Sequence, residues 1–145
     1  NSAEMWGGHR ITSDVFALAT AVLFQSGIQH FALAPNNLTD APEWAINFMK
    51  EVPVLWDEVR FIDGYPGRYV VLARRHGDKW YVAGVSAQKG LLKLRLNLPM
   101  IPGGKEIKLY GDSDTLNGSV TITKLNKKQQ IDVTIPENGG FVIMD

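Results

Sequence analysis

Hydrophobic and polar residues alternate along the second half of the chain. Leucines occupy every second position from Leu92 to Leu98, with polar residues between them. The same alternation places Ile131, Val133 and Ile135 on one side of a second segment. Because successive side chains of a strand point to opposite faces, this pattern predicts antiparallel strands with one buried and one wet face.

Turn residues (Gly, Pro, Asn and Asp) divide the chain after residue 56 into short segments. Their spacing predicts about eight strands, an arrangement typical of a sandwich or a barrel. Two of the segments, 69–73 and 81–85, are apolar at consecutive positions, so we expect them centrally in a sheet or against helices. The expected strands span residues 56–63, 68–75, 79–86, 90–98, 105–110, 119–125, 129–135 and 140–144.

The first third of the chain has a helical pattern instead. Residues 12–14 offer an N-cap followed by an acidic first turn, which predicts a helix from about 13 to 29. Nearly every residue from 15 to 24 is apolar, and such a helix is normally buried on more than one side. We therefore expect it to pack against a body that lies outside this chain.

A second helix is expected at about 41–51, with Asp40 as its N-cap and Pro42 at a tolerated early position. Pro53 ends it. The predicted organisation is a disordered or loop segment at 1–11, a helical segment at 12–52 and a β domain at 53–145. The fold class is mainly β: an antiparallel β-sandwich of about eight strands, preceded by two helices.

Charge and composition exclude several classes of partner. Lys+Arg and Asp+Glu are both 15, so no basic footprint indicates a nucleic-acid partner. The absence of cysteine excludes disulfides and thiol catalysis. The longest apolar run, 15–24, falls short of the roughly 18 residues that a membrane helix needs, so no membrane partner is expected. Without a basic stretch before it, this run does not resemble a signal peptide.

The sequence contains no recognisable pattern of catalytic residues. Asp57 and Glu58 are neighbours on an expected strand, so they should point to opposite faces and not act as a carboxylate pair. Residues 112–118 resemble a calcium loop, but the glycine comes one place late and Thr123 replaces the closing acid. His9, His30 and His76 lack zinc-site spacing. We therefore predict no catalytic residue, no cofactor-binding residue and no metal ligand in this chain.

Aromatic residues are the remaining candidates for binding. Aromatic faces can stack on sugar rings, although aromatics on strands beside helices more often pack in a core or an interface. Trp80 and Tyr81 are consecutive, so one of them should face the core and the other the opposite side. The candidates for sugar or interface contact are Trp56, Tyr65, Trp80 and Tyr81.

Several segments together resemble the C-terminal region of family 97 of the glycoside hydrolases. The residues that carry the resemblance are 51–58 (EVPVLWDE), 67–75 (GRYVVLARR) and 77–82 (GDKWYV). The upstream stretch 12–30, followed by Ala34-Pro35, is similar to the last barrel helix of that family and its exit. The resemblance covers about residues 12–98, and the later strands match in kind.

The resemblance implies a parent enzyme with an N-terminal β-sandwich, a central (β/α)8 barrel and this β domain, the two helices being the end of the barrel. Members are calcium-dependent α-glucosidases or α-galactosidases, inverting or retaining, that work in the periplasm of Gram-negative bacteria. The family's catalytic and calcium-ligating residues lie in the barrel, before the matched stretch. This fragment is accordingly expected to be inactive and without a cofactor, in a periplasmic or secreted protein.

Three functions are compatible with these observations. The first is an accessory domain that packs on its own catalytic barrel or forms a homo-oligomer, which predicts an exposed apolar patch or a dimer. The second is a carbohydrate-binding module, motivated by the aromatic content. The third is a free-standing enzyme, against which the lack of barrel carboxylates argues. We favour the first.

Overall fold

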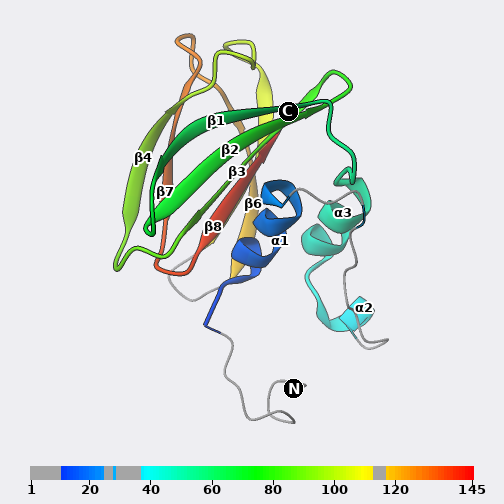
Figure 1. Ribbon diagram of the computed structural model, residues 1–145. Helices are drawn as coiled ribbons and strands as arrows, with labels where there is room; N and C mark the ends of the chain where they lie inside the picture. Colours follow the sequence, from blue (N-terminus) through cyan, green and yellow to red (C-terminus); the bar gives the residue numbers. More distant parts are fainter. Residues whose placement is uncertain (1–10, 25–27, 29–36, 113–116) are drawn as a thin grey trace.

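The computed structural model describes residues 11–24, 28, 37–112 and 117–145. Three helices precede eight strands in the described part of the chain (Figure 1). Each predicted strand is present, with bounds within two residues of those expected. The elements are α1 (Asp14–Leu23), α2 (Asn37–Asp40), α3 (Glu43–Glu51), β1 (Glu58–Tyr65), β2 (Tyr69–His76), β3 (Lys79–Ser86), β4 (Leu92–Asn97), β5 (Glu106–Asp112), β6 (Gly118–Lys124), β7 (Gln130–Ile135) and β8 (Gly140–Met144).

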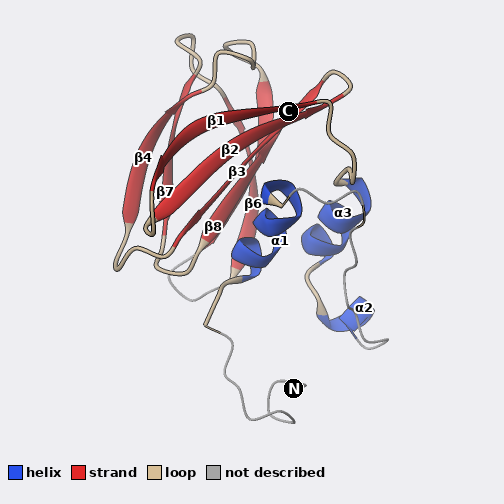
Figure 2. Ribbon diagram, viewed as in Figure 1, coloured by secondary structure: helices blue, strands red, loops and turns tan. Residues whose placement is uncertain are grey.

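The described strands form two antiparallel sheets. Six of them make one sheet in the order β1-β2-β3-β8-β5-β6, and β4 pairs with β7 in a second sheet. The helices lie on one side of the large sheet and the β4–β7 pair lies on the other (Figure 2). This arrangement confirms the predicted mainly-β fold with helices before antiparallel strands.

The large sheet separates two hydrophobic cores. Along β3, Trp80 and Val82 face the β4–β7 pair, whereas Tyr81 and Ala83 face the helices. β8 divides its residues in the same alternating way. A strand that is buried on both faces must be apolar at consecutive positions. The prediction that the segments 69–73 and 81–85 lie centrally or against the helices is therefore confirmed.

Helix α1 lies across β3, β8 and β5, and six of its residues are buried. Ser13 caps it, because its hydroxyl accepts the Phe16 N–H at 3.1 Å. The chain's own sheet and α3 cover most of the helix, so the apolar composition is largely explained without an outside body. The solvent-exposed residues of this region are Ala17 in the helix and Phe24 directly after it; the side chain of Phe24 is 66% exposed. Phe16 is partly buried.

The predicted helix end at residue 29 is wrong, because the helix ends at Leu23 and Phe24 is extended. A buried arginine, Arg74 on β2, donates from Nη2 to the Leu23 carbonyl oxygen at 2.8 Å. In a longer helix this oxygen would accept the N–H of residue 27 instead. Residues 25–27 and 29–36, which include His30 and the Ala34-Pro35 exit, lie outside the described residues, as do His9 and the rest of 1–10.

The second predicted helix occurs as α3, but its cap differs from the prediction. Pro42, rather than Asp40, occupies the N-cap position, and no side chain there caps the helix. Asp40 belongs to the short helix α2. The proline ring fixes its own φ near the helical value, which favours a start directly after it.

Candidate functional surfaces

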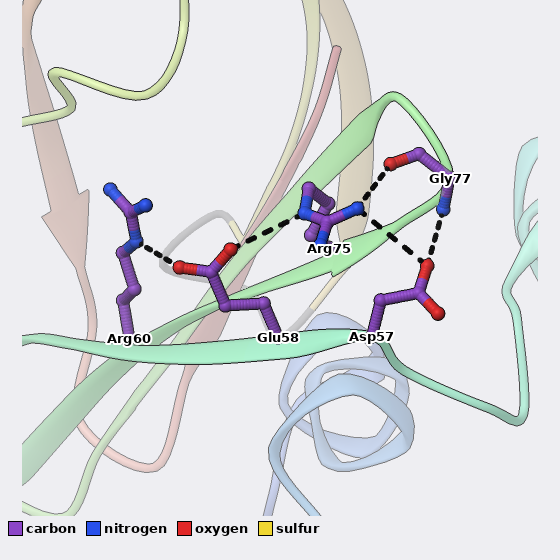
Figure 3. A network of polar contacts seen from close by, with 5 residues as sticks. All are labelled: Asp57, Glu58, Arg60, Arg75 and Gly77. Carbon is purple, nitrogen blue, oxygen red and sulfur yellow. Dashed lines mark hydrogen bonds and ion pairs between the residues drawn. The ribbon is translucent and has the colours of Figure 1, made fainter.

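A group of charged side chains lies at the start of β1 (Figure 3). Glu58 accepts from Arg60 Nε at 2.6 Å and from Arg75 Nε at 3.3 Å. Asp57 reaches the same arginine, with Oδ2 3.8 Å from Arg75 Nη1, and also accepts the Gly77 N–H at 2.8 Å. The expectation that Asp57 and Glu58 point to opposite faces is therefore wrong. Asp57 precedes the strand, so the alternation of strand side chains does not apply to it.

The Arg60 hydrogen bond, together with Arg75, lowers the pKa of Glu58 below its ordinary value. Arg75 reaches both carboxylates, at 3.8 Å from Asp57 and 3.3 Å from Glu58, and the lowered pKa keeps Glu58 in the ionised form. General acid catalysis needs a carboxyl group with a raised pKa. This cluster is therefore a set of surface ion pairs that ties β1 to β2.

Asp112, at the end of β5, connects three parts of the chain. Its carboxylate accepts from the Ser13 hydroxyl, from the Val15 N–H at 3.0 Å and from the Gly140 N–H at 2.8 Å. The negative charge lies at the positive N-terminal end of α1. This residue belongs to the segment that resembled a calcium loop, and the structure shows that its oxygens bind backbone and hydroxyl groups. Residues 113–116 of that segment lie outside the described residues.

The described residues contain no cluster of three or more His, Cys, Asp or Glu side chains that could hold a metal ion. His76 lies exposed at the end of β2, with Nδ1 2.9 Å from the Leu55 carbonyl oxygen. The calcium that the resemblance implies therefore finds no fitting set of ligands in the described part of this chain.

Two of the four aromatic candidates are buried. Trp80 faces the core beneath the β4–β7 pair, with the Arg60 guanidinium 4.9 Å from its ring centre. Tyr81 faces the helix-side core, where burial raises the pKa of its phenol. The two rings lie on opposite sides of the sheet, and both sides are core. Neither ring presents a face on which a sugar could stack.

The other two candidates differ in exposure. Trp56 is half-buried and meets Tyr81 edge to face, with ring centres 5.2 Å apart. Its Nε1 has no hydrogen-bond partner among the described residues. Tyr65 is 56% exposed, and the Arg68 guanidinium lies 4.7 Å from its ring centre. Only Tyr65 of the four offers an accessible ring.

Tyr65 borders an open groove of about 510 Å³ at the β1 edge of the sheet. Phe61, which is 68% exposed, lies in it, and Phe16 from the first turn of α1 forms its other side. A sugar site needs several convergent polar groups, whereas apolar side chains dominate this groove. An apolar lining of this kind suits contact with protein better than contact with carbohydrate. It is lined by Phe16, Phe61, Gly64, Tyr65, Pro66, Gly67, Arg68, Tyr69, Val70, Val85 and Ala87.

Comparison with known proteins identifies the chain. Residues 55–144 match the family described as glycosyl-hydrolase 97 C-terminal, oligomerisation. The chain belongs to this family. The suspected resemblance to the C-terminal region of family 97 is thereby confirmed, and the chain is a C-terminal domain of a family 97 glycoside hydrolase.

Relatives show how small a part of the whole enzyme this family 97 domain is. A retaining alpha-galactosidase of Bacteroides thetaiotaomicron is 42% identical over 69 residues, which are 48% of this chain and 10% of that protein. A beta-arabinopyranosidase crystal structure shares 50% identity and a TM-score of 0.89 over 94% of this chain and 22% of its own. A family 97 enzyme from Pseudoalteromonas sp. strain K8 shares the fold at 24% identity and a TM-score of 0.80, over 92% of this chain and 22% of its own.

Proposed function

We propose that this domain packs on the catalytic barrel of its own polypeptide and supports the barrel's folding and assembly. The observation that carries the proposal is the apolar groove between Phe61 of β1 and Phe16 of α1. An exposed apolar surface of this kind marks a protein–protein contact. The accessory role also agrees with the Asp57–Glu58 cluster, whose carboxylates form ion pairs with Arg60 and Arg75.

The position of the groove indicates which body covers it. This chain spans only 22% of the solved beta-arabinopyranosidase chain, so a large catalytic part is expected in the parent polypeptide. Phe16 belongs to the first turn of α1, so the groove borders the side from which the preceding chain arrives. In this proposal, α1 is the last helix of the barrel, and part of the barrel's surface packs into the groove.

A pair of lysine substitutions tests the docking surface in the full polypeptide. Phe61→Lys should uncouple the β domain from the catalytic part, so that one thermal transition becomes two and a protease cuts between them. Leu55→Lys is the matched control, because Leu55 is 65% exposed and does not line the groove. Equal behaviour of the two variants would refute docking through the groove.

The parent activity is the second part of the proposal. The name of the Bacteroides relative supports hydrolysis of α-galactosides, with α-glucosides as the alternative within the family. The 50% identical structure supports a β-arabinopyranoside substrate as a further candidate. Nitrophenyl derivatives of the three sugars, offered to the full polypeptide and to the 145-residue chain, decide among them. We expect turnover only by the full polypeptide.

Calcium and location belong to the same proposal. The calcium site should lie in the catalytic domain, since the described residues here offer no ligand cluster. A chelator should lower the melting temperature of the full polypeptide and leave that of the 145-residue chain unchanged. We propose a periplasmic or secreted location, which cell fractionation tests. Among the described residues, no helix is long and apolar enough to cross a membrane.

Carbohydrate binding is the alternative function, and the exposed ring of Tyr65 supports it. Titration calorimetry with maltose-series and galactose-containing oligosaccharides tests it on the 145-residue chain. Heat that disappears in Tyr65→Ala would establish a sugar site. The lack of a response at millimolar sugar would remove this alternative and leave the docking proposal untouched.

A further inference from the structure

The two edges of the large sheet differ in how they are protected. The β1 edge has a register shift between Phe61 and Asp63 and carries the charged Glu58 and Arg60. Bulges and charges are the devices by which proteins prevent edge-to-edge pairing. The β6 edge has neither inside Ser119–Thr123, and its register with β5 is unbroken over the described residues. β6 is the edge that is open to another strand.

At the even positions of β6, the backbone hydrogen-bonding groups point away from β5, toward a side where the described residues place no strand. Leu125, the residue directly after β6, donates its N–H to the Lys105 carbonyl oxygen at 3.0 Å, on the β5 side. Since backbone groups of successive strand residues point to opposite sides, Val120 and Ile122 direct theirs away from β5. An added strand would find donors and acceptors at these two residues.

The side chains of β6 sort by face. Val120 and Ile122 pair with Tyr110 and Lys108 of β5 and stand on the helix side, 40% and 63% exposed. Thr121 stands on the other side, as does Thr123. The edge therefore combines a short apolar stripe with backbone groups that point away from β5, the combination that strand addition uses.

We propose that a second copy of this domain pairs with β6 in an antiparallel, two-fold arrangement centred on Thr121. Val120 of one copy then lies opposite Ile122 of the other, in a pair whose backbone groups bond to each other. The proposal deepens the proposed accessory role, because it names the partner of the domain. The family's description as an oligomerisation domain supports a copy of the same chain.

Register and charge favour this centre. Pairing around Thr121 uses all of Gly118–Lys124 and places its one charged residue, Lys124, opposite Gly118. A centre at Ile122 would place Val120 against Lys124, and a centre at Val120 would leave Ile122 against Gly118. The Thr121 register alone matches apolar with apolar twice, which an isologous contact repeats by symmetry.

Cysteine cross-linking tests the register, because the chain has no cysteine of its own. The backbone groups of Thr121 face β5, so the two Thr121 residues form a non-hydrogen-bonded pair with Cα atoms about 4.5 Å apart. This separation suits a disulfide. Under mild oxidation, Thr121→Cys should give a covalent dimer on a non-reducing gel.

Two off-axis positions provide the controls. Ser119 lies opposite Thr123 in the proposed dimer, so Ser119→Cys alone and Thr123→Cys alone should stay monomeric on the gel. Mixed together, the two variants should give a covalent heterodimer. Equal self-linking by Thr121→Cys and Ser119→Cys, or none by Thr121→Cys, would overturn the register.

Sedimentation equilibrium of the full chain tests the contact itself. Ile122→Lys should weaken self-association at least tenfold, whereas Phe61→Lys should leave it unchanged. Circular dichroism checks that both variants are folded, as their exposure on opposite edges predicts. A wild-type chain that stays monomeric up to high concentration would refute the β6 contact. Loss of self-association in Phe61→Lys but not in Ile122→Lys would refute it as well. Loss of domain coupling in Phe61→Lys would still support the docking proposal, so the two can fail separately.

Discussion

Single polar residues hold distant parts of this chain together. The Asp112 carboxylate gathers a hydroxyl and two backbone N–H groups from the start of α1 and the start of β8. Arg74 binds the other end of α1 through the Leu23 carbonyl oxygen, and burial lowers the pKa of its guanidinium. Helix α1 is therefore fixed at both termini by side chains from the sheet.

Removing the Asp112 carboxylate should destabilise the domain. Asp112→Ala leaves three donors without an acceptor, and we expect a loss of about 2–4 kcal/mol in the free energy of unfolding. Asp112→Asn keeps one acceptor oxygen and should lose less. Urea denaturation followed by circular dichroism measures both. A decrease of less than about 0.5 kcal/mol in the free energy of unfolding of Asp112→Ala would show that the hydrogen bonds to Asp112 contribute little.

The ion pairs at Glu58 should show in its titration. The pKa of this carboxyl lies below its ordinary value, so the contribution of the pairs to stability is present at neutral pH and lost as the pH falls through the folded value. Carboxyl NMR should find that Arg60→Met raises the pKa of Glu58 more than Arg75→Met does, because the Arg60 hydrogen bond is the larger cause. The reverse order would contradict the contact distances.

At this scale the sequence predicted little. The polar residues at 112–118 resembled a calcium loop, but two partners of Asp112 lie 97 and 99 residues earlier in the chain, and the third lies 28 residues later. Likewise, Trp80 and Tyr81 were candidates for sugar or interface contact as aromatic residues, and alternation placed one of them on the face opposite the core. Alternation does not reveal that a second layer covers each face. Long-range contacts of this kind have no local signature.

Elements were predicted more faithfully, because their signals are local. The alternation of leucines predicted β4. The segments 69–73 and 81–85, which are apolar at consecutive positions, predicted β2 and β3, the strands that are packed on both faces. The end of α1 was missed, since Arg74 binds the Leu23 carbonyl from 51 residues away. The groove could not be predicted from the sequence either, because its lining combines residues from the start of α1 with residues of β1, β2 and β3.

Close packing between neighbouring strands requires glycine at one position. A Cβ atom on Gly84 of β3 would overlap the ring of Phe141 on β8 and approach Val71 at 3.0 Å. Phe141 is itself buried in the core. Gly84→Ala should therefore cost about 1–3 kcal/mol of stability through overpacking.

A glycine on β5, on the other side of β8, is the control. A Cβ atom on Gly111 of β5 would meet no described atom within 4 Å, so Gly111→Ala should change stability by less than about 0.5 kcal/mol. Thermal unfolding measures both variants, and Phe141→Leu combined with Gly84→Ala should recover part of the loss. Similar melting temperatures for the two alanine variants would refute the packing argument.

The whole molecule is organised around two strands that serve both cores. β3 and β8 are paired on each side and buried on each face, whereas β1 and β6 have one neighbour each within the described sheet. Backbone groups in such central strands open only with the whole fold.

Hydrogen exchange should follow this order. At a dilution that keeps the chain monomeric, the amides of 79–86 and 140–144 should exchange slowest and those of 58–65 and 118–124 fastest among the strands. Mass spectrometry of proteolytic fragments measures the rates. Protection of β6 equal to that of β8 in the monomer would show that the edges are not the weaker part.

The place of β8 also bears on synthesis. It follows every other strand in the sequence, yet it joins β1-β2-β3 to β5-β6 in the finished sheet. While the ribosome is still translating earlier codons, the two halves have no common neighbour through which to join. Closure must therefore wait until residues 140–144 leave the exit tunnel, and a product that lacks these residues would have no strand to join β3 to β5.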